Sequence, residues 1–246
     1  MRTPSSSELL DAWAAAAFLG PTARALALLL AAAEEEEEPG ALAALPLGRR
    51  DGRLLELRSR LFGPILAAAI SCPGCGERLE LEAESNELAA GPGEADADAI
   101  ESIALDGWVA RFRLPNSHDL AAVEGRRDAA AAGRSLLESC LAGVTWEGRE
   151  VPAGNLPQEL AGAIGRRMAE LDPLAAPDVA VDCPDCGQQW QAPVDIAGFL
   201  WSEVDAWARR TLFQVHELAS AYSWTEDTVL ALSPAKRARY LELVAG

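Results

Sequence analysis

Cys72-Pro73-Gly74-Cys75-Gly76 and Cys183-Pro184-Asp185-Cys186-Gly187 are two versions of one motif, and together they use four of the five cysteines of the chain. A C-x-x-C turn presents two sulfurs to one metal ion, and zinc takes four soft ligands at the corners of a tetrahedron. The glycine after each second cysteine allows a left-handed backbone that directs N–H groups at the sulfurs. The two motifs therefore predict one structural Zn²⁺ site with four ligands: Cys72, Cys75, Cys183 and Cys186.

The residues around the two motifs also correspond. Apolar Leu79 and Leu81 follow the first motif, and Trp190 and Ala192 stand at the same offsets after the second. This period of two predicts strands, so each motif is expected at the tip of a β-hairpin. The separation of the motifs is far longer than in an ordinary zinc ribbon, because the whole stretch 76–182 lies between them. It predicts an insertion folded between the hairpins.

Three other uses of paired cysteines compete with a zinc site. A disulfide framework favours an even number of cysteines and a secretory signal, whereas this chain has five cysteines and we expect no signal. A redox C-x-x-C pair opens a helix, whereas strand-like alternation follows both motifs. Covalent haem attachment needs histidine where both motifs have glycine. The fifth cysteine, Cys140, lies in a helical pattern and is expected to be a buried thiol.

Length and charge limit the function classes. The 246 residues, half of them apolar, suffice for one domain with an appendage or for two small domains. The net charge of −17, from 21 basic and 38 acidic residues, argues against nucleic-acid binding. The apolar stretch 25–33 is shorter than a membrane span, so we expect a cytoplasmic protein without membrane insertion.

The predicted fold class is α+β, in three parts. A helical N-terminal arm with an acidic linker covers 1–40, a zinc-knuckle core with its insertion covers 41–194, and a helical region covers 195–246. In the arm, Ser7 is the expected cap of the first helix, a second helix starts near Thr22, and 34–40 is the expected linker.

Within the core, helical periodicity runs from Leu54 to Leu66, and Pro64 suggests a bend or an end there. Loop composition marks 84–98. A strand is expected over 108–114, followed by a helix that Ser117 caps and another that begins at Pro157. The insertion is thus expected to hold strands covered by two or three helices.

The C-terminal region shows the clearest helical pattern. A wide apolar stripe predicts a long helix from Ile196 to Tyr222, and two short helices follow, the first with Ser223 and Glu226 as a capping box. Neither histidine of the chain stands in a catalytic motif, and no phosphate loop or nucleophile elbow occurs. We therefore expect a non-enzymatic protein.

The C-terminal sequence resembles that of tail-associated proteins of contractile phages. The stretches that carry the resemblance are 199–207, 215–219, 222–226 and 229–241, with 114–120 and 168–173 adding to it. From about residue 45 to the end, the chain is similar to the small baseplate-hub assembly proteins of T-even-like phages. It is closer still to zinc-knuckle versions encoded with contractile injection systems.

This resemblance implies a baseplate component or an assembly factor of a contractile tail-like particle, cytoplasmic or built into the particle. Its partners would be baseplate, spike or tube proteins. Aromatic side chains give large contact areas at low entropic cost, and basic ones suit an acidic partner. The candidate docking residues are Trp201, Tyr222, Trp224, Lys236, Arg237 and Arg239. Two alternatives are an acidic zinc-ribbon adaptor of transcription or translation proteins and a thiol oxidoreductase using Cys72 and Cys75.

Overall fold

The computed structural model describes residues 1–34, 37–85, 88 and 99–245. It divides into two compact units. The helical unit comprises Met1–Glu36 and Ala197–Gly246, and the hairpin unit comprises Glu37–Ile196. Most of the predicted N-terminal arm and of the predicted C-terminal region thus lies in one unit. Among the described helices, none combines the length and the apolar content that a membrane span needs.

The helical unit begins with a hairpin of two helices, α1 (Ser6–Ala16) and α2 (Pro21–Ala31). Ser5, and not Ser7 as predicted, is the N-cap of α1. Its side chain accepts from the Glu8 N–H while the Glu8 carboxylate accepts from the Ser5 N–H, which makes a capping box.

The long helix α9 (Ile196–Tyr222) is present as the apolar stripe predicts. The indole of Trp13 in α1 donates to the carboxylate of Asp205 in α9 at 2.9 Å, and this bond ties the first helix to the last third of the chain.

Two short helices close the helical unit, α10 (Glu226–Leu230) and α11 (Pro234–Ala245). Thr225 caps α10, so the predicted capping box at Ser223 is wrong; Ser223 instead has a left-handed backbone with φ 55°. These helices pack against the end of α9 around buried Val215, Leu218 and Val229. We call this the C-terminal cluster, and five partly buried side chains complete it: Trp224, Leu230, Tyr240, Leu241 and Val244.

The hairpin unit starts with a short helix, α3 (Pro39–Ala44), and a longer one, α4 (Leu47–Phe62). The predicted linker 34–40 therefore ends inside α3, and its residues 35 and 36 lie outside the described residues. Gly63, with φ 93°, ends α4, so Ile65 and Leu66 belong to a strand and not to the predicted helix. Asp172, 124 positions beyond Gly48, caps α4 because its carboxylate accepts from the Gly48 N–H at 2.9 Å.

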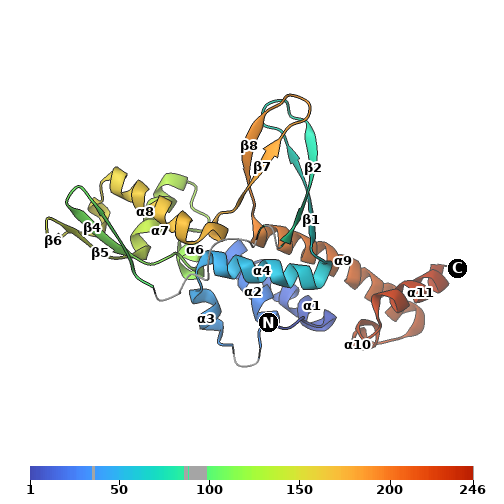
Figure 1. Ribbon diagram of the computed structural model, residues 1–246. Helices are drawn as coiled ribbons and strands as arrows, with labels where there is room; N and C mark the ends of the chain where they lie inside the picture. The colour runs from blue at the N-terminus through green and yellow to red at the C-terminus, as the bar shows by residue number, and fades with distance from the viewer. Residues whose placement is uncertain (35–36, 86–87, 89–98, 246) are drawn as a thin grey trace. The chain divides into compact units, whose positions relative to one another are not determined.

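Two antiparallel hairpins carry the cysteine motifs. The first pairs β1 (Ile65–Ser71) with β2 (Arg78–Glu84), and the second pairs β7 (Asp178–Asp182) with β8 (Gln189–Pro193). Ile70 opposes Leu79 in the first hairpin as Val181 opposes Trp190 in the second, so each hairpin has one apolar face. The two hairpins stand side by side with adjacent tips (Figure 1).

The insertion contains a four-stranded antiparallel sheet in the order β3-β4-β5-β6. Its strands are β3 (Glu101–Leu105), β4 (Trp108–Phe112), β5 (Leu141–Trp146) and β6 (Arg149–Glu150). Its helices are α6 (Ser117–Val123), α7 (Ala129–Cys140) and α8 (Gln158–Leu171), with short 3-10 turns at Ala153–Asn155 and Pro173–Ala175.

The insertion has a core of its own. Ala110, Phe112 and Val144 from the sheet pack against Leu160 and Ile164 of α8. The cap of α6 is Asn116 and not the predicted Ser117. Most of the predicted loop 84–98 lies outside the described residues, which include only 84, 85 and 88 of it. The architecture as a whole mixes helices with small antiparallel sheets, in agreement with the α+β class.

Candidate metal centre

Each cysteine motif forms the turn between the strands of its hairpin, and the two turns have the same backbone bonds. The N–H of Cys72 donates to the carbonyl of Glu77 at 2.8 Å, and the N–H of Cys183 donates to that of Gln188 at 2.9 Å. In both turns, the glycine after the second cysteine has a left-handed backbone, with φ 78° at Gly76. Such a turn brings both sulfurs of a motif to the same side.

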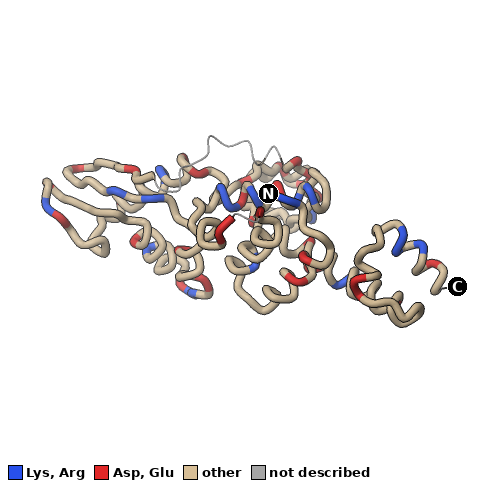
Figure 2. Tube along the Cα trace, turned by 90° about the horizontal axis from the view of Figure 1, so that it is seen from below, with Lys and Arg blue, Asp and Glu red and all other residues tan. Residues whose placement is uncertain are grey.

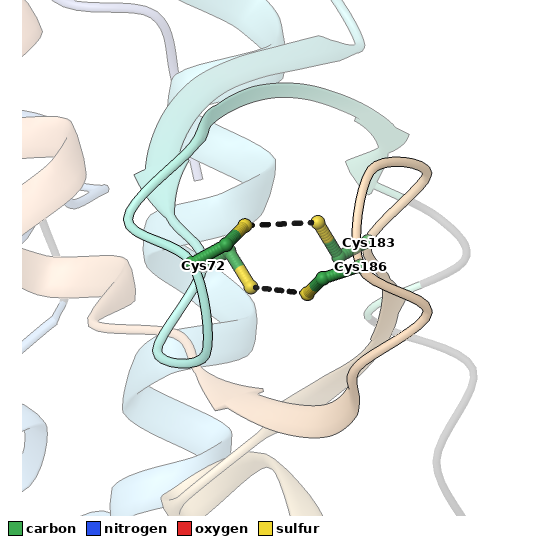
Figure 3. A group of neighbouring side chains, drawn as sticks. Cys72, Cys183 and Cys186 are labelled. Atoms are coloured by element: carbon green, nitrogen blue, oxygen red, sulfur yellow. Dashed lines mark hydrogen bonds between the residues drawn. The ribbon is translucent and has the colours of Figure 1, made fainter.

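The four sulfurs converge between the two hairpin tips (Figure 3). The Sγ atoms of Cys72 and Cys186 lie 3.6 Å apart, as do those of Cys75 and Cys183, and all four lie within 4.8 Å of one another. A disulfide needs about 2.05 Å between sulfurs, so all four cysteines are free thiols. Four thiols at these distances could hold one metal ion.

The two motifs also contact each other beside the sulfurs. A Cβ on Gly74 would lie 3.5 Å from the sulfur of Cys186 and 3.4 Å from the Cβ of Gln188. The N–H of Gly74 points at the sulfur of Cys72, 3.4 Å away. Cys72 and Cys183 are each 2 % exposed, whereas the second cysteine of each motif is exposed. The centre is therefore closed on the side of the first cysteines and reaches solvent on the other.

Thiols packed this closely do not ionise independently. The N–H of Cys75, followed by that of Gly74 and the neighbouring thiols, lowers the pKa of Cys72 to about 7 in spite of burial. The N–H of Glu77 acts in the same direction on Cys75, but burial and the other three thiols outweigh it and raise its pKa to about 12. One thiol thus ionises readily, and the thiolate that it forms opposes the ionisation of its neighbours.

The predicted docking residues fall into separate groups. Tyr222 and Trp224 lie together, with their rings stacked at 4.8 Å. Tyr240, which is not among the predicted docking residues, meets the Trp224 ring edge-on at 5.0 Å. We call these three rings the aromatic trio. Trp201 has a different neighbour, the guanidinium of Arg24, 4.9 Å above its ring. Tyr222 lies in α9 and Tyr240 in α11, so the periodicity of a single helix could not predict that these two rings meet.

The basic residues of α11 also divide. Lys236 and Arg239 are exposed, and Arg239 pairs with Glu242 at 2.9 Å. Arg237 is 2 % exposed, so its charge does not lie on the surface as its neighbours' charges do.

A buried polar group outside the metal centre had no sequence signal. The carboxylate of Asp119 in α6 accepts hydrogen bonds from both terminal nitrogens of Arg113, at 2.6 and 2.8 Å, and from the hydroxyl of Ser139. Cys140 lies beside them, 1 % exposed, and burial raises the pKa of its thiol to about 11. This arrangement joins α6 to the end of α7 and is a structural link. His118 and His216 are both exposed.

Comparison of the sequence with protein-family models, with curated proteins and with solved structures gives no match in any of the three.

Proposed function

We propose that this chain is a non-enzymatic, zinc-stabilised docking protein that joins, or helps to assemble, the baseplate of a contractile tail-like particle. The observation that carries the zinc part is the convergence of four sulfurs from two hairpins. For a Zn–S bond of about 2.3 Å, tetrahedral geometry places sulfurs about 3.8 Å apart. The two separations of 3.6 Å are close to that value.

The donor set supports a structural ion. Four thiolates fill every tetrahedral position of the ion. Catalytic zinc needs one open position for a water or a substrate, and this donor set leaves none. Both C-x-x-C turns sit between antiparallel strands, whereas a thioredoxin-like pair precedes a helix. A dication also balances the thiolate charges that oppose one another in its absence.

The docking part rests on the sequence resemblance and on the aromatic trio. Tyr222 is 37 % exposed at the end of α9, and aromatic side chains of this kind dominate protein interfaces. The net charge of −17 favours proteins over nucleic acids as partners. Baseplate, spike or tube proteins are the proposed partners, in the cytoplasm or in the assembled particle.

The test has two readouts. The first is the metal content of the purified protein, for which we expect one zinc per chain and its loss in Cys72→Ser. The second is capture from the protein's own host, comparing wild type with Tyr222→Ser. Phe213→Ser is the matched control, because Phe213 is an exposed aromatic residue of the same helix, 64 % exposed, and is not part of the trio.

Recovery of baseplate, spike or tube proteins with wild type and Phe213→Ser, but less with Tyr222→Ser, is the expected result. Recovery of polymerase or ribosomal proteins would replace the partner class with the transcription or translation adaptor. Zinc-free protein that cycles a Cys72–Cys75 disulfide with a dithiol would replace the structural site with a redox site.

A further inference from the structure

Arg237 is a buried cation for which the described residues supply no partner. The side chain is 2 % exposed, and its Nε and Nη1 atoms are buried without a hydrogen bond. Within the described part of the chain, its guanidinium makes no hydrogen bond or ion pair. Buried charges in proteins are normally paired, because an unpaired one loses its hydration without compensation. Burial accordingly lowers the pKa of Arg237.

The position of Arg237 in α11 explains how it comes to be buried. Tyr240, Leu241 and Val244 follow it by three, four and seven residues, so the four side chains share one helix face. The other three pack in the C-terminal cluster. Arg237 thus occupies a core position of a small apolar module, where leucine or methionine would satisfy packing better.

The guanidinium is nevertheless not sealed from solvent. Its third nitrogen, Nη2, has no partner among the residues that the structure describes and is not one of the buried atoms, so it retains contact with solvent. Tyr240 lies one helical turn away, and through it the aromatic trio adjoins the same helix face. A group that approaches Nη2 therefore meets a fixed charge beside the aromatic trio, in which Tyr222 is exposed and Trp224 and Tyr240 are partly buried.

We infer that Arg237 is the anchor for a carboxylate of an acidic segment in a partner protein, with the aromatic trio packing against apolar residues next to that carboxylate. The inference rests on the proposed docking function and adds the chemistry of the partner. The solvent-facing Nη2 donates a charge-assisted hydrogen bond to that carboxylate, and the low polarity around the guanidinium strengthens the attraction.

Local charge favours an anionic partner. Figure 2 shows basic positions on the final helix, beside the C-terminus. α11 carries Lys236, Arg237 and Arg239 against one acid, Glu242, in a chain whose net charge is −17. In a protein partner, apolar residues beside the carboxylate can pack against the aromatic trio. A polyanionic nucleic acid would instead be repelled by the negative charge of the rest of the chain.

The experiment uses the full chain as wild type, Arg237→Met and Arg210→Met. Arg210→Met is the matched control, because it removes one positive charge from the same unit at an exposed position of α9 outside the docking residues. Chemical denaturation is measured first. We expect Arg237→Met to be at least as stable as wild type, since an unpaired buried charge is replaced by an apolar side chain of similar length. Clear destabilisation would show a structural role for Arg237 and would overturn the inference.

Binding is then measured with a probe that needs no known partner, a library of random linear peptides selected on immobilised wild-type protein. We expect selected peptides to carry Asp or Glu. They should bind Arg210→Met about as well as wild type. They should bind Arg237→Met at least about 30-fold more weakly, the loss expected when one member of a buried ion pair is removed. The same peptides with Asn and Gln in place of Asp and Glu should lose binding to a similar extent.

Three results would overturn the inference: selected peptides without carboxylates, equal binding to Arg237→Met, and Arg237-dependent binding of a single-stranded oligonucleotide instead of peptides. Its failure is separable from that of the proposed function. Particle proteins captured equally by wild type and Arg237→Met would contradict only the anchor. Acidic peptides bound through Arg237, with no particle proteins captured, would contradict only the baseplate assignment.

Discussion

Loss of one zinc ligand should destabilise the hairpin unit far more than the helical unit. The proposed ion joins two turns that are distant in the sequence, since Cys75 and Cys183 stand 108 positions apart. In the loop-closure treatment of cross-links, a link across about 100 residues removes about 4.7 kcal/mol of chain entropy from the unfolded state. A zinc ion bound by Cys72, Cys75, Cys183 and Cys186 restricts the unfolded chain in the same way.

The change in melting temperature follows from this value. For about 150–250 residues, 1 kcal/mol corresponds to about 2–4 °C, so Cys72→Ser should lower the transition of the hairpin unit by about 10–20 °C. Residues 37–196 form that unit, whereas the helical unit contains no ligand of the site and its transition should not move.

Calorimetry of wild type, chelator-treated wild type and Cys72→Ser measures this shift. Cys140→Ser is the control: it makes the same chemical change at a buried cysteine outside the cluster and should leave the metal content intact. Equal transitions in zinc-loaded and zinc-free protein would refute the structural role. A shift of the same size in both units would refute its assignment to the hairpins.

Three further substitutions test local features. Gly76→Ala forces a side chain into a backbone with φ 78°, which costs about 1–2 kcal/mol and should weaken zinc binding about tenfold in a competition titration, whereas Gly74→Ala meets only ordinary contacts. Gly48→Ala would place a Cβ 1.8 Å from Asp172 Oδ1 and should lower the free energy of unfolding by about 1–3 kcal/mol in urea. Burial acts to raise the pKa of Asp119, but the hydrogen bonds from Arg113, Asn116 and Ser139 outweigh it and lower that pKa. The ionised carboxylate therefore stabilises the folded state above about pH 4, and this stabilisation is lost as the pH falls. Asp119→Asn should therefore destabilise at neutral pH and differ little from wild type near pH 2.

The cysteine centre was predictable because its signal is short-range and repeated. A C-x-x-C-G turn fixes its own geometry locally, and two such turns in one chain supply one tetrahedral set. Alternating residues such as Leu79 and Trp190 indicated the hairpins, and both are paired strands in the structure. The sequence could also indicate that an insertion exists, because the stretch 76–182 must fold between the turns.

Element boundaries were less predictable because several residues can cap one helix. Ser5 caps α1 although Ser7 has the same side chain, and the capping box with Glu8 decides between them. Asn116 similarly takes the place predicted for Ser117. At Ile65, an apolar residue continued a helical period, but a left-handed glycine two residues earlier had already ended the helix.

Long-range polar contacts had no sequence signal. Asp172 caps α4 although it stands 124 positions from Gly48, and no local pattern connects an aspartate at the end of α8 with that glycine. Arg237 was grouped with Lys236 and Arg239 because all three are basic neighbours. Helical geometry separates them: adjacent residues differ by about 100° around the helix, so one of the three faces the core.

The distribution of buried residues in the hairpin unit indicates which strands should open first when the proposed metal is lost. A two-stranded hairpin is marginal alone, and Leu66 is the one buried residue of β1. The four-stranded sheet of the insertion, in contrast, packs with α8 around its own core, which includes Phe112 and Ile164. Metal loss should therefore release β1, β2, β7 and β8 before the sheet opens. Because both ends of the insertion run into these hairpins, the proposed zinc ion would connect them through metal–sulfur bonds at a point where buried apolar surface is scarce.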